Sequence, residues 1–158
     1  MKWTMQDIDT YLQAKEYVDT AVIPLIPIDL KEDVKQKVSM GTFISTMADA
    51  IERQFKGRVL LFPAFTYIKN QPLEKRKSEL IDWDRHVYEQ GFKHVVYLTA
   101  DGDWKQVEDE LPDMLVWLPA LPFENMEDRY LKQMIDQQMK QIIPLLTNKW
   151  QSEPKQRP

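Results

Sequence analysis

Four short segments of this chain are apolar at almost every position: 21–26, 58–62, 95–98 and 115–118. A strand with one face in water alternates apolar and polar residues, whereas a strand covered on both faces is apolar throughout. The segments between these runs carry apolar residues three and four positions apart, which is the spacing of a helix. The alternation of the two patterns predicts an α/β protein.

The predicted architecture is a three-layer sandwich, in which helices cover both faces of a four-stranded, mainly parallel sheet. The expected helices span 4–18, 30–56, 75–90, 103–111 and 127–150. Right-handed crossovers restrict the topology and favour a Rossmann-like strand order of 2-1-3-4. Two points stay open: 30–56 forms one helix or two, with a break near Ser39, and Pro144 either kinks the last helix or starts a new segment.

One residue opposes this strand order. Order 2-1-3-4 places segment 21–26 in the interior of the sheet, where Pro24 cannot donate a ladder hydrogen bond. Pro24 therefore predicts either that this strand lies at an edge or that it bulges there.

The length of the chain fits one domain, because 158 residues is close to the commonest domain size of about 100–150 residues. Residues 1–150 are expected to form that single α/β domain. Segment 151–158 is polar and contains two prolines, so we predict that it is a disordered tail.

Composition excludes several kinds of protein. The chain has no cysteine, which excludes disulfides, thiolate nucleophiles and cysteine-ligated zinc, and its two histidines cannot form a three-histidine metal site. Its net charge of −4 argues against nucleic acid as a partner. Lys69, Lys75, Arg76 and Lys77 form one basic cluster, which is expected to be a solvated helix start rather than an RNA contact.

The sequence contains no sign of a membrane segment. No apolar run approaches the roughly 20 residues that a spanning helix needs. The first residues lack the apolar core of a signal peptide, and acidic residues appear as early as Asp7. We therefore predict a cytoplasmic protein without a membrane span.

Polar residues follow three of the predicted strands. In an open parallel sheet, ligands bind beyond the carboxyl ends of the strands, so these residues are candidates for a ligand-binding or partner-binding site. They are Asp29 after the first strand, Thr66, Tyr67 and Lys69 after the second, and Asp101 and Asp103 after the third.

The three carboxylates among these candidates, Asp29, Asp101 and Asp103, could together bind Mg²⁺, which prefers hard oxygen ligands. Alternatively, Asp29 and Asp103 begin capping boxes with Glu32 and Gln106, and Asp101 belongs to a turn. We prefer the caps, because the chain has neither the G-x-G-x-x-G nor the G-x-x-x-x-G-K-[ST] phosphate-binding motif. We predict no metal ion, no cofactor and no catalytic residue.

Segment 63–74 has two prolines and no clear period, and it is predicted to be a long loop. Loops of about 12 residues in a compact domain are usually functional or disordered. This loop leaves the second strand at the carboxyl edge of the sheet, so it is the preferred functional segment. The alternative is that Phe65, Tyr67 and Ile68 fold back and cover the sheet edge.

A family resemblance is carried by two segments: GRVLLFPAFTY at 57–67 and MKWTMQDIDTYLQAKEYVDTAVIPLIPID at 1–29. They resemble the YpiF-like family of Bacillus and its relatives, a domain of unknown function. The resemblance covers about residues 1–150. It implies a bacterial cytoplasmic protein, and it brings no activity, cofactor or site residue with it.

Two functions remain open from the sequence. The preferred one is a non-catalytic cytoplasmic module that interacts with another protein or has a regulatory role. The alternative is a small-molecule or nucleotide-binding enzyme with its site at the carboxyl ends of the strands. The fold cannot choose between them, because this architecture supports many functions.

Overall fold

A computed structural model describes residues 1–157 of the chain. Within them lies one sheet with strands β1 (Thr20–Ile28), β2 (Val59–Leu61), β3 (Phe65–Ile68), β4 (His94–Thr99) and β5 (Met114–Trp117). Every pairing is parallel, the order is β2-β1-β4-β5, and β3 also pairs with β1. The predicted α/β class and the predicted 2-1-3-4 order are confirmed.

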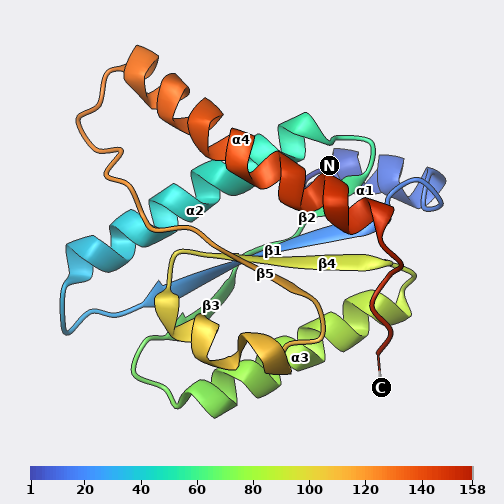
Figure 1. The fold of residues 1–158 in the computed structure, drawn as a ribbon, viewed down its shortest axis with the longest axis horizontal. Helices are drawn as coiled ribbons and strands as arrows, with labels where there is room; N and C mark the ends of the chain where they lie inside the picture. Colours follow the sequence, from blue (N-terminus) through green and yellow to red (C-terminus); the bar gives the residue numbers. More distant parts are fainter. Residues whose placement is uncertain (158) are drawn as a thin grey trace.

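Helices cover both faces of this sheet and complete the three layers (Figure 1). The helical elements are α1 (Met5–Gln13), α2 (Val34–Gln54), α3 (Leu73–Glu89), the 3₁₀ helix η1 (Gly102–Glu110) and α4 (Asp128–Gln151). Helices α2 and α4 pack on one face through Phe43, Met47 and Ile142. Helix α3 and η1 pack on the other face through Leu80 and Trp104. The apolar runs of the strands supply side chains to both cores, as their pattern predicts.

The fifth strand lies inside the segment that we predicted to be a loop, 63–74. β3 continues along the edge of β1 that β2 leaves. Between the pairs Val22–Leu61 and Leu25–Phe65, this edge advances by four residues while β1 advances by three. The extra residue makes a bulge that accommodates Pro63, which has no amide hydrogen.

The interior position of Pro24 follows from this interruption. The carbonyl of Val22 accepts a hydrogen bond from the Phe62 amide, so Val22 faces the β2 side. Alternate residues of a strand direct their amides to the same neighbour, and Pro24 therefore faces the gap between β2 and β3. Pro27 faces the other neighbour, beyond Leu25, the last β1 residue that pairs with β4. Neither proline removes a ladder hydrogen bond.

The helix boundaries differ from prediction at their caps. Residues 34–54 form one helix, and its N-cap is Asp33 with φ of 47°. Asp29 instead accepts hydrogen bonds from the amides of Lys31 and Glu32 in the turn before that helix. η1 is capped by Asp101, whose carboxylate accepts from the amide of Asp103, the residue we predicted as the cap. α4 continues through Pro144 as one helix.

The predicted disorder of the segment after α4 stays a prediction, and the structure adds one contact in it. Residues 152–156 are exposed, but the side chain of Arg157 is only 8% exposed and pairs with Asp84 and Asp113. These carboxylates come from α3 and from the residue before β5. The sequence of the tail alone therefore could not predict this pairing. Pro158, the last residue of the predicted tail, lies outside the described residues.

In residues 1–157, no helix is both long enough and apolar enough to cross a membrane. This agrees with the absence of a long apolar run in the sequence.

His94 is expected to give the fold a pH dependence. The residue is 3% exposed, and its Nδ1 has no hydrogen-bond partner. Burial, then the charge of Lys149, lowers the pKa of His94, and the opposing charges of Asp19 and Asp113 do not restore it. The unfolded chain therefore binds a proton that the folded chain does not, and the free energy of unfolding falls as the pH drops below about 6.5.

Urea unfolding between pH 7.5 and 5 measures this slope, which cannot exceed about 1.4 kcal/mol per pH unit for one proton. His94→Gln should flatten it, whereas His86→Gln, at an exposed position of α3, should not. Equal slopes in wild type and His94→Gln would contradict the expectation.

Candidate functional site

Four of the six candidate residues meet at the carboxyl edge of the sheet. We call this group, with two further residues, the carboxyl-edge cluster. Its members come from β3, the segment after β3, α3, the β4–η1 connection and η1: Tyr67, Lys69, Arg76, Asp101, Asp103 and Trp104.

Asp101 lies at the centre of the cluster and is 1% exposed. Its carboxylate accepts from the Tyr67 hydroxyl at 2.7 Å and from the Lys69 ammonium at 2.6 Å. Lys69 also donates to Asp103 at 2.8 Å, so one ammonium bridges two carboxylates. The Tyr67 oxygen accepts from the indole nitrogen of Trp104 at 2.9 Å. Five members of the cluster, all except Arg76, are therefore joined by hydrogen bonds to one another.

The protonation states in the cluster are fixed by these contacts. Burial alone would raise the pKa of Asp101, but hydrogen bonds from Lys69 and Tyr67 lower it below the usual value. Burial and the adjacent Asp101 charge raise the pKa of Tyr67 well above its usual value. Asp101 is therefore ionised and Tyr67 protonated at neutral pH, which suits a fixed donor and acceptor pair better than a proton-transfer pair.

Arg76 is a member that the sequence did not reveal. We predicted the basic residues 75–77 to be a solvated helix start, yet Arg76 is 4% exposed. Its guanidinium lies 3.7 Å from Asp101 and 3.6 Å from Asp103, and 5.1 Å above the Tyr67 ring. Its Nη1 is buried without a hydrogen-bond partner. The missing signal is the rotation of α3, which buries Arg76 against Asp101 and Asp103, whereas Lys77 pairs with Glu110 at the exposed end of η1.

Two candidates do not join the cluster. Asp29 is held by the turn before α2, with Lys37 at 3.9 Å. Thr66 points to the exposed side of β3. Within residues 1–157, no group of three or more acidic or histidine side chains could hold a metal ion. Asp29, Asp101 and Asp103 thus do not come together as the Mg²⁺ site that the sequence offered as an alternative to helix caps and a turn.

The arrangement fastens η1 and α3 to the edge of the sheet. Phe65 and Tyr67 are buried, as the structural alternative for this segment requires, while Ile68 remains 46% exposed. Aromatic contacts join Phe65, Tyr67 and Trp104, with ring centres 5.4–6.1 Å apart. The cluster therefore has an evident role in stability, and the prediction that it binds a ligand or partner stays a prediction.

Tyr67→Phe is expected to lower the free energy of unfolding by about 1–3 kcal/mol, because it leaves the buried Trp104 indole N–H and one Asp101 oxygen without their partner. Urea unfolding measures the loss. Tyr17→Phe is the matched control, since Tyr17 is 69% exposed. An unchanged stability in Tyr67→Phe would show that the hydroxyl is not a structural bridge.

A second feature is an apolar groove between α1 and α3. A cavity of about 380 Å³ is lined by Trp3, Phe62, Pro63 and Trp83, and a second of about 230 Å³ continues from it along α1. Trp3, Phe62, His86 and Val87 line both. We call the joined cavities the Trp3–Trp83 groove.

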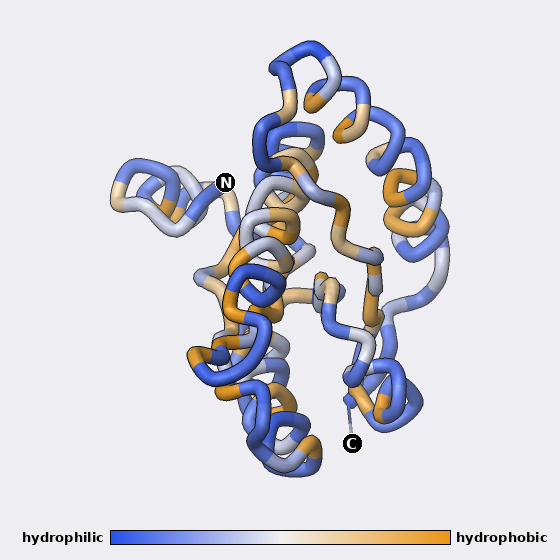
Figure 2. Tube along the Cα trace, turned by 90° about the vertical axis from the view of Figure 1, so that its left-hand side faces the viewer, coloured by the Kyte–Doolittle hydropathy of each residue, from blue (hydrophilic) through white to orange (hydrophobic). Residues whose placement is uncertain are grey.

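Helix α1 forms the outer wall of this groove without being part of the core. Figure 2 shows α1 beside the N-terminus, standing apart from the layers. None of its residues is buried. Leu12 is 55% exposed, and Trp3, just before the helix, is 57% exposed although it lies 5.3 Å from the Phe62 ring. The groove thus presents aromatic and aliphatic side chains to solvent.

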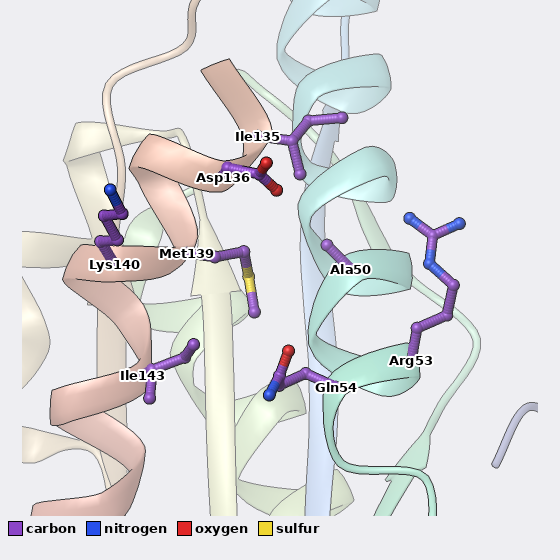
Figure 3. A pocket seen from close by; sticks show the side chains of 8 residues that line it. All are labelled: Ala50, Arg53, Gln54, Ile135, Asp136, Met139, Lys140 and Ile143. Atoms are coloured by element: carbon purple, nitrogen blue, oxygen red, sulfur yellow. The ribbon is translucent and has the colours of Figure 1, made fainter. Parts of the chain in front are cut away.

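A third cavity, of about 330 Å³, lies between α2 and α4. Figure 3 shows Met139 and Gln54 pointing toward one another across the gap, whereas Arg53 points away. The polar residues that line this cavity, Arg53, Gln54, Asp136 and Lys140, are all exposed. They lack the buried, oriented groups typical of a ligand site.

The parallel sheet with helices on both faces defines the chain as an α/β three-layer sandwich. The family model described as "Protein of unknown function (DUF2487)" matches residues 9–150, and the chain belongs to this family. It is 37% identical over 155 residues to "Uncharacterized protein YpiF" of Bacillus subtilis (strain 168), which covers 95% of this chain and 98% of that protein. No solved structure matches the chain. The predicted family resemblance is confirmed.

Proposed function

We propose that this chain is a non-catalytic module that acts in the cytoplasm by binding another protein through the Trp3–Trp83 groove. The observation that carries the proposal is an apolar cavity lined by the exposed Trp3 and by two half-buried aromatic residues, Phe62 and Trp83. Tryptophan is enriched among the residues that contribute most to binding at protein interfaces.

The shape of the groove favours an amphipathic helix of the partner. One cavity lies between α1 and α3, and the other adjoins it along α3, where Asp82, Trp83, His86 and Val87 line it. A partner helix that places apolar side chains three or four residues apart would put successive anchors into successive cavities. Asp82 lines one cavity and Lys15 the other, and both can contact the polar sides of such a helix.

The carboxyl edge supports the same choice of surface. The polar residues that a strand-end site would use already bind one another there. A partner in the Trp3–Trp83 groove would gain apolar area without breaking these buried hydrogen bonds.

Surface variants test the proposal. Trp3→Ser and Leu12→Ser remove exposed apolar area from the groove, and we expect both to abolish capture of the protein that the immobilised wild type retains from a cell lysate, with an unchanged melting temperature. The retained protein is then identified by mass spectrometry and titrated against each variant.

Trp117→Ser is the matched control, because Trp117 is an exposed tryptophan on β5 that does not line the groove. Capture that survives Trp3→Ser and Leu12→Ser, or that is lost equally in Trp117→Ser, would overturn the proposal.

The alternative of an enzyme that binds a small anion is favoured by one observation, the buried Nη1 of Arg76 without a hydrogen-bond partner. A phosphate would supply that partner. Inorganic phosphate or ATP should then raise the melting temperature of the wild type but not of Arg76→Leu. No shift in the wild type would exclude this alternative for both ligands.

A further inference from the structure

The tail places a guanidinium between two buried carboxylates. Arg157 donates from Nε to Asp84 at 2.7 Å, and from Nη2 to Asp84 at 3.1 Å and to Asp113 at 2.9 Å. Its Nη1 donates to the carbonyl of Lys155 at 2.7 Å. The Tyr88 ring lies 4.6 Å from the guanidinium carbon. Every edge of the guanidinium is therefore used.

These contacts are selective for arginine. Two parallel hydrogen bonds to one carboxylate require the planar fork of a guanidinium, which the ammonium of lysine cannot reproduce. The aromatic ring adds a face on which a guanidinium stacks. The carboxylates of Asp84 and Asp113 are 1% and 0% exposed, so water competes little for them.

The rest of the fold positions both carboxylates without help from the tail. The hydroxyl of Tyr97 donates to Asp84 at 2.5 Å. Asp113 accepts from the backbone amides of Val95 and Met114 at 2.9 Å and 2.8 Å, and pairs with Lys149. The site is thus built into the sheet and α3, and the tail supplies only its occupant.

The tail reaches this site as a tether with little packing of its own. Residues 152–156 are all exposed, and Figure 1 shows the segment descending from α4 past the sheet. A cavity of about 710 Å³ lies between Glu153, Pro154 and Gln156 of the tail and the end of α3. A second, of about 220 Å³, adjoins Arg157 beside Ile81 and Pro112. Arg157 can therefore leave without disturbing either core.

We propose that Asp84, Tyr88 and Asp113 form a binding site for a peptide arginine, which the tail occupies in cis and which an arginine of a partner protein takes in exchange. A short tether holds its own ligand at an effective concentration on the order of millimolar. A partner arginine must therefore bind the site strongly enough to compete with the tail at this effective concentration.

A labelled peptide tests the proposal. The probe is a fluorescent peptide of residues 152–158, and its binding is measured by anisotropy on the chain truncated after Gln151 and on the full chain. We expect saturable binding to the truncated chain, weakened roughly tenfold or more in the full chain, where the tail competes. A peptide with lysine in place of Arg157 should bind roughly tenfold or more weakly than the arginine peptide.

Three results would overturn the proposal: no saturable binding to the truncated chain, equal binding of the lysine peptide, or equal binding to the full chain. Light scattering that shows a dimer of the full chain at the assay concentration would assign the site to the tail of a second copy, and would overturn exchange with a partner.

A second variant covers the case in which the truncated chain does not fold. Arg157→Gln in the full chain removes the guanidinium and keeps the tether, and N-acetyl-arginine amide at millimolar concentration is then the probe. It should raise the melting temperature of Arg157→Gln, while N-acetyl-lysine amide should not. Equal shifts from the two probes, or none, would also overturn the proposal.

Discussion

Replacing Asp113 with alanine is expected to lower the free energy of unfolding by about 3–5 kcal/mol, the cost typical of removing one partner from a buried ion pair. The Asp113 carboxylate is 0% exposed and pairs with both Lys149 and Arg157. It also accepts two backbone amides. Without it, Lys149 loses its partner while remaining 7% exposed.

Urea unfolding at pH 7 measures this loss. Asp109→Ala is the matched control, because Asp109 is an exposed carboxylate on η1, and its loss should change the free energy of unfolding by about 0.5 kcal/mol or less. A loss below about 1 kcal/mol in Asp113→Ala would show that the two cations find other partners or solvent.

Trp104→Ala is expected to cost about 3–5 kcal/mol, the range for truncating a large aromatic side chain in a core. Trp104 is 0% exposed and packs edge-on against Tyr67 and Phe65. Its indole N–H also donates to the Tyr67 hydroxyl. The substitution therefore opens a cavity under η1 and removes a hydrogen bond from the carboxyl-edge cluster.

The control for this change is Trp117→Ala. Trp117 is 37% exposed and contacts Lys105 through its ring, so its removal should cost less than about 1 kcal/mol. Similar losses in the two variants, measured by thermal or urea unfolding, would contradict the placement of Trp104 at the centre of the second core.

The layers of the fold could be predicted because they depend on local patterns. Segments 21–26 and 95–98 are apolar on both faces, and such strands are stable only between two layers of helices. The interruption at Pro63 could not be predicted in the same way. It depends on the register of two strands against β1, and the alternation of buried and exposed residues in β3 covers only four positions.

The meeting of Lys69, Asp101 and Asp103 could be predicted because the carboxyl ends of parallel strands share one edge. Their pairing with Arg76 could not, because it depends on how α3 is rotated over η1. Arg157 was missed for a similar reason: its partners lie 73 and 44 residues away. Sequence spacing carries no signal for contacts of that range.

Photo-crosslinking in living cells tests the choice of the Trp3–Trp83 groove as the partner surface most directly. Benzoylphenylalanine is placed in turn at Trp3, in the groove, and at Ile68, which is 46% exposed beside the carboxyl-edge cluster. We expect a discrete protein adduct from position 3, reduced by Leu12→Ser, and none from position 68. A discrete adduct from position 68 with none from position 3 would contradict the proposed function. It would indicate that the partner binds at the carboxyl edge of the sheet instead.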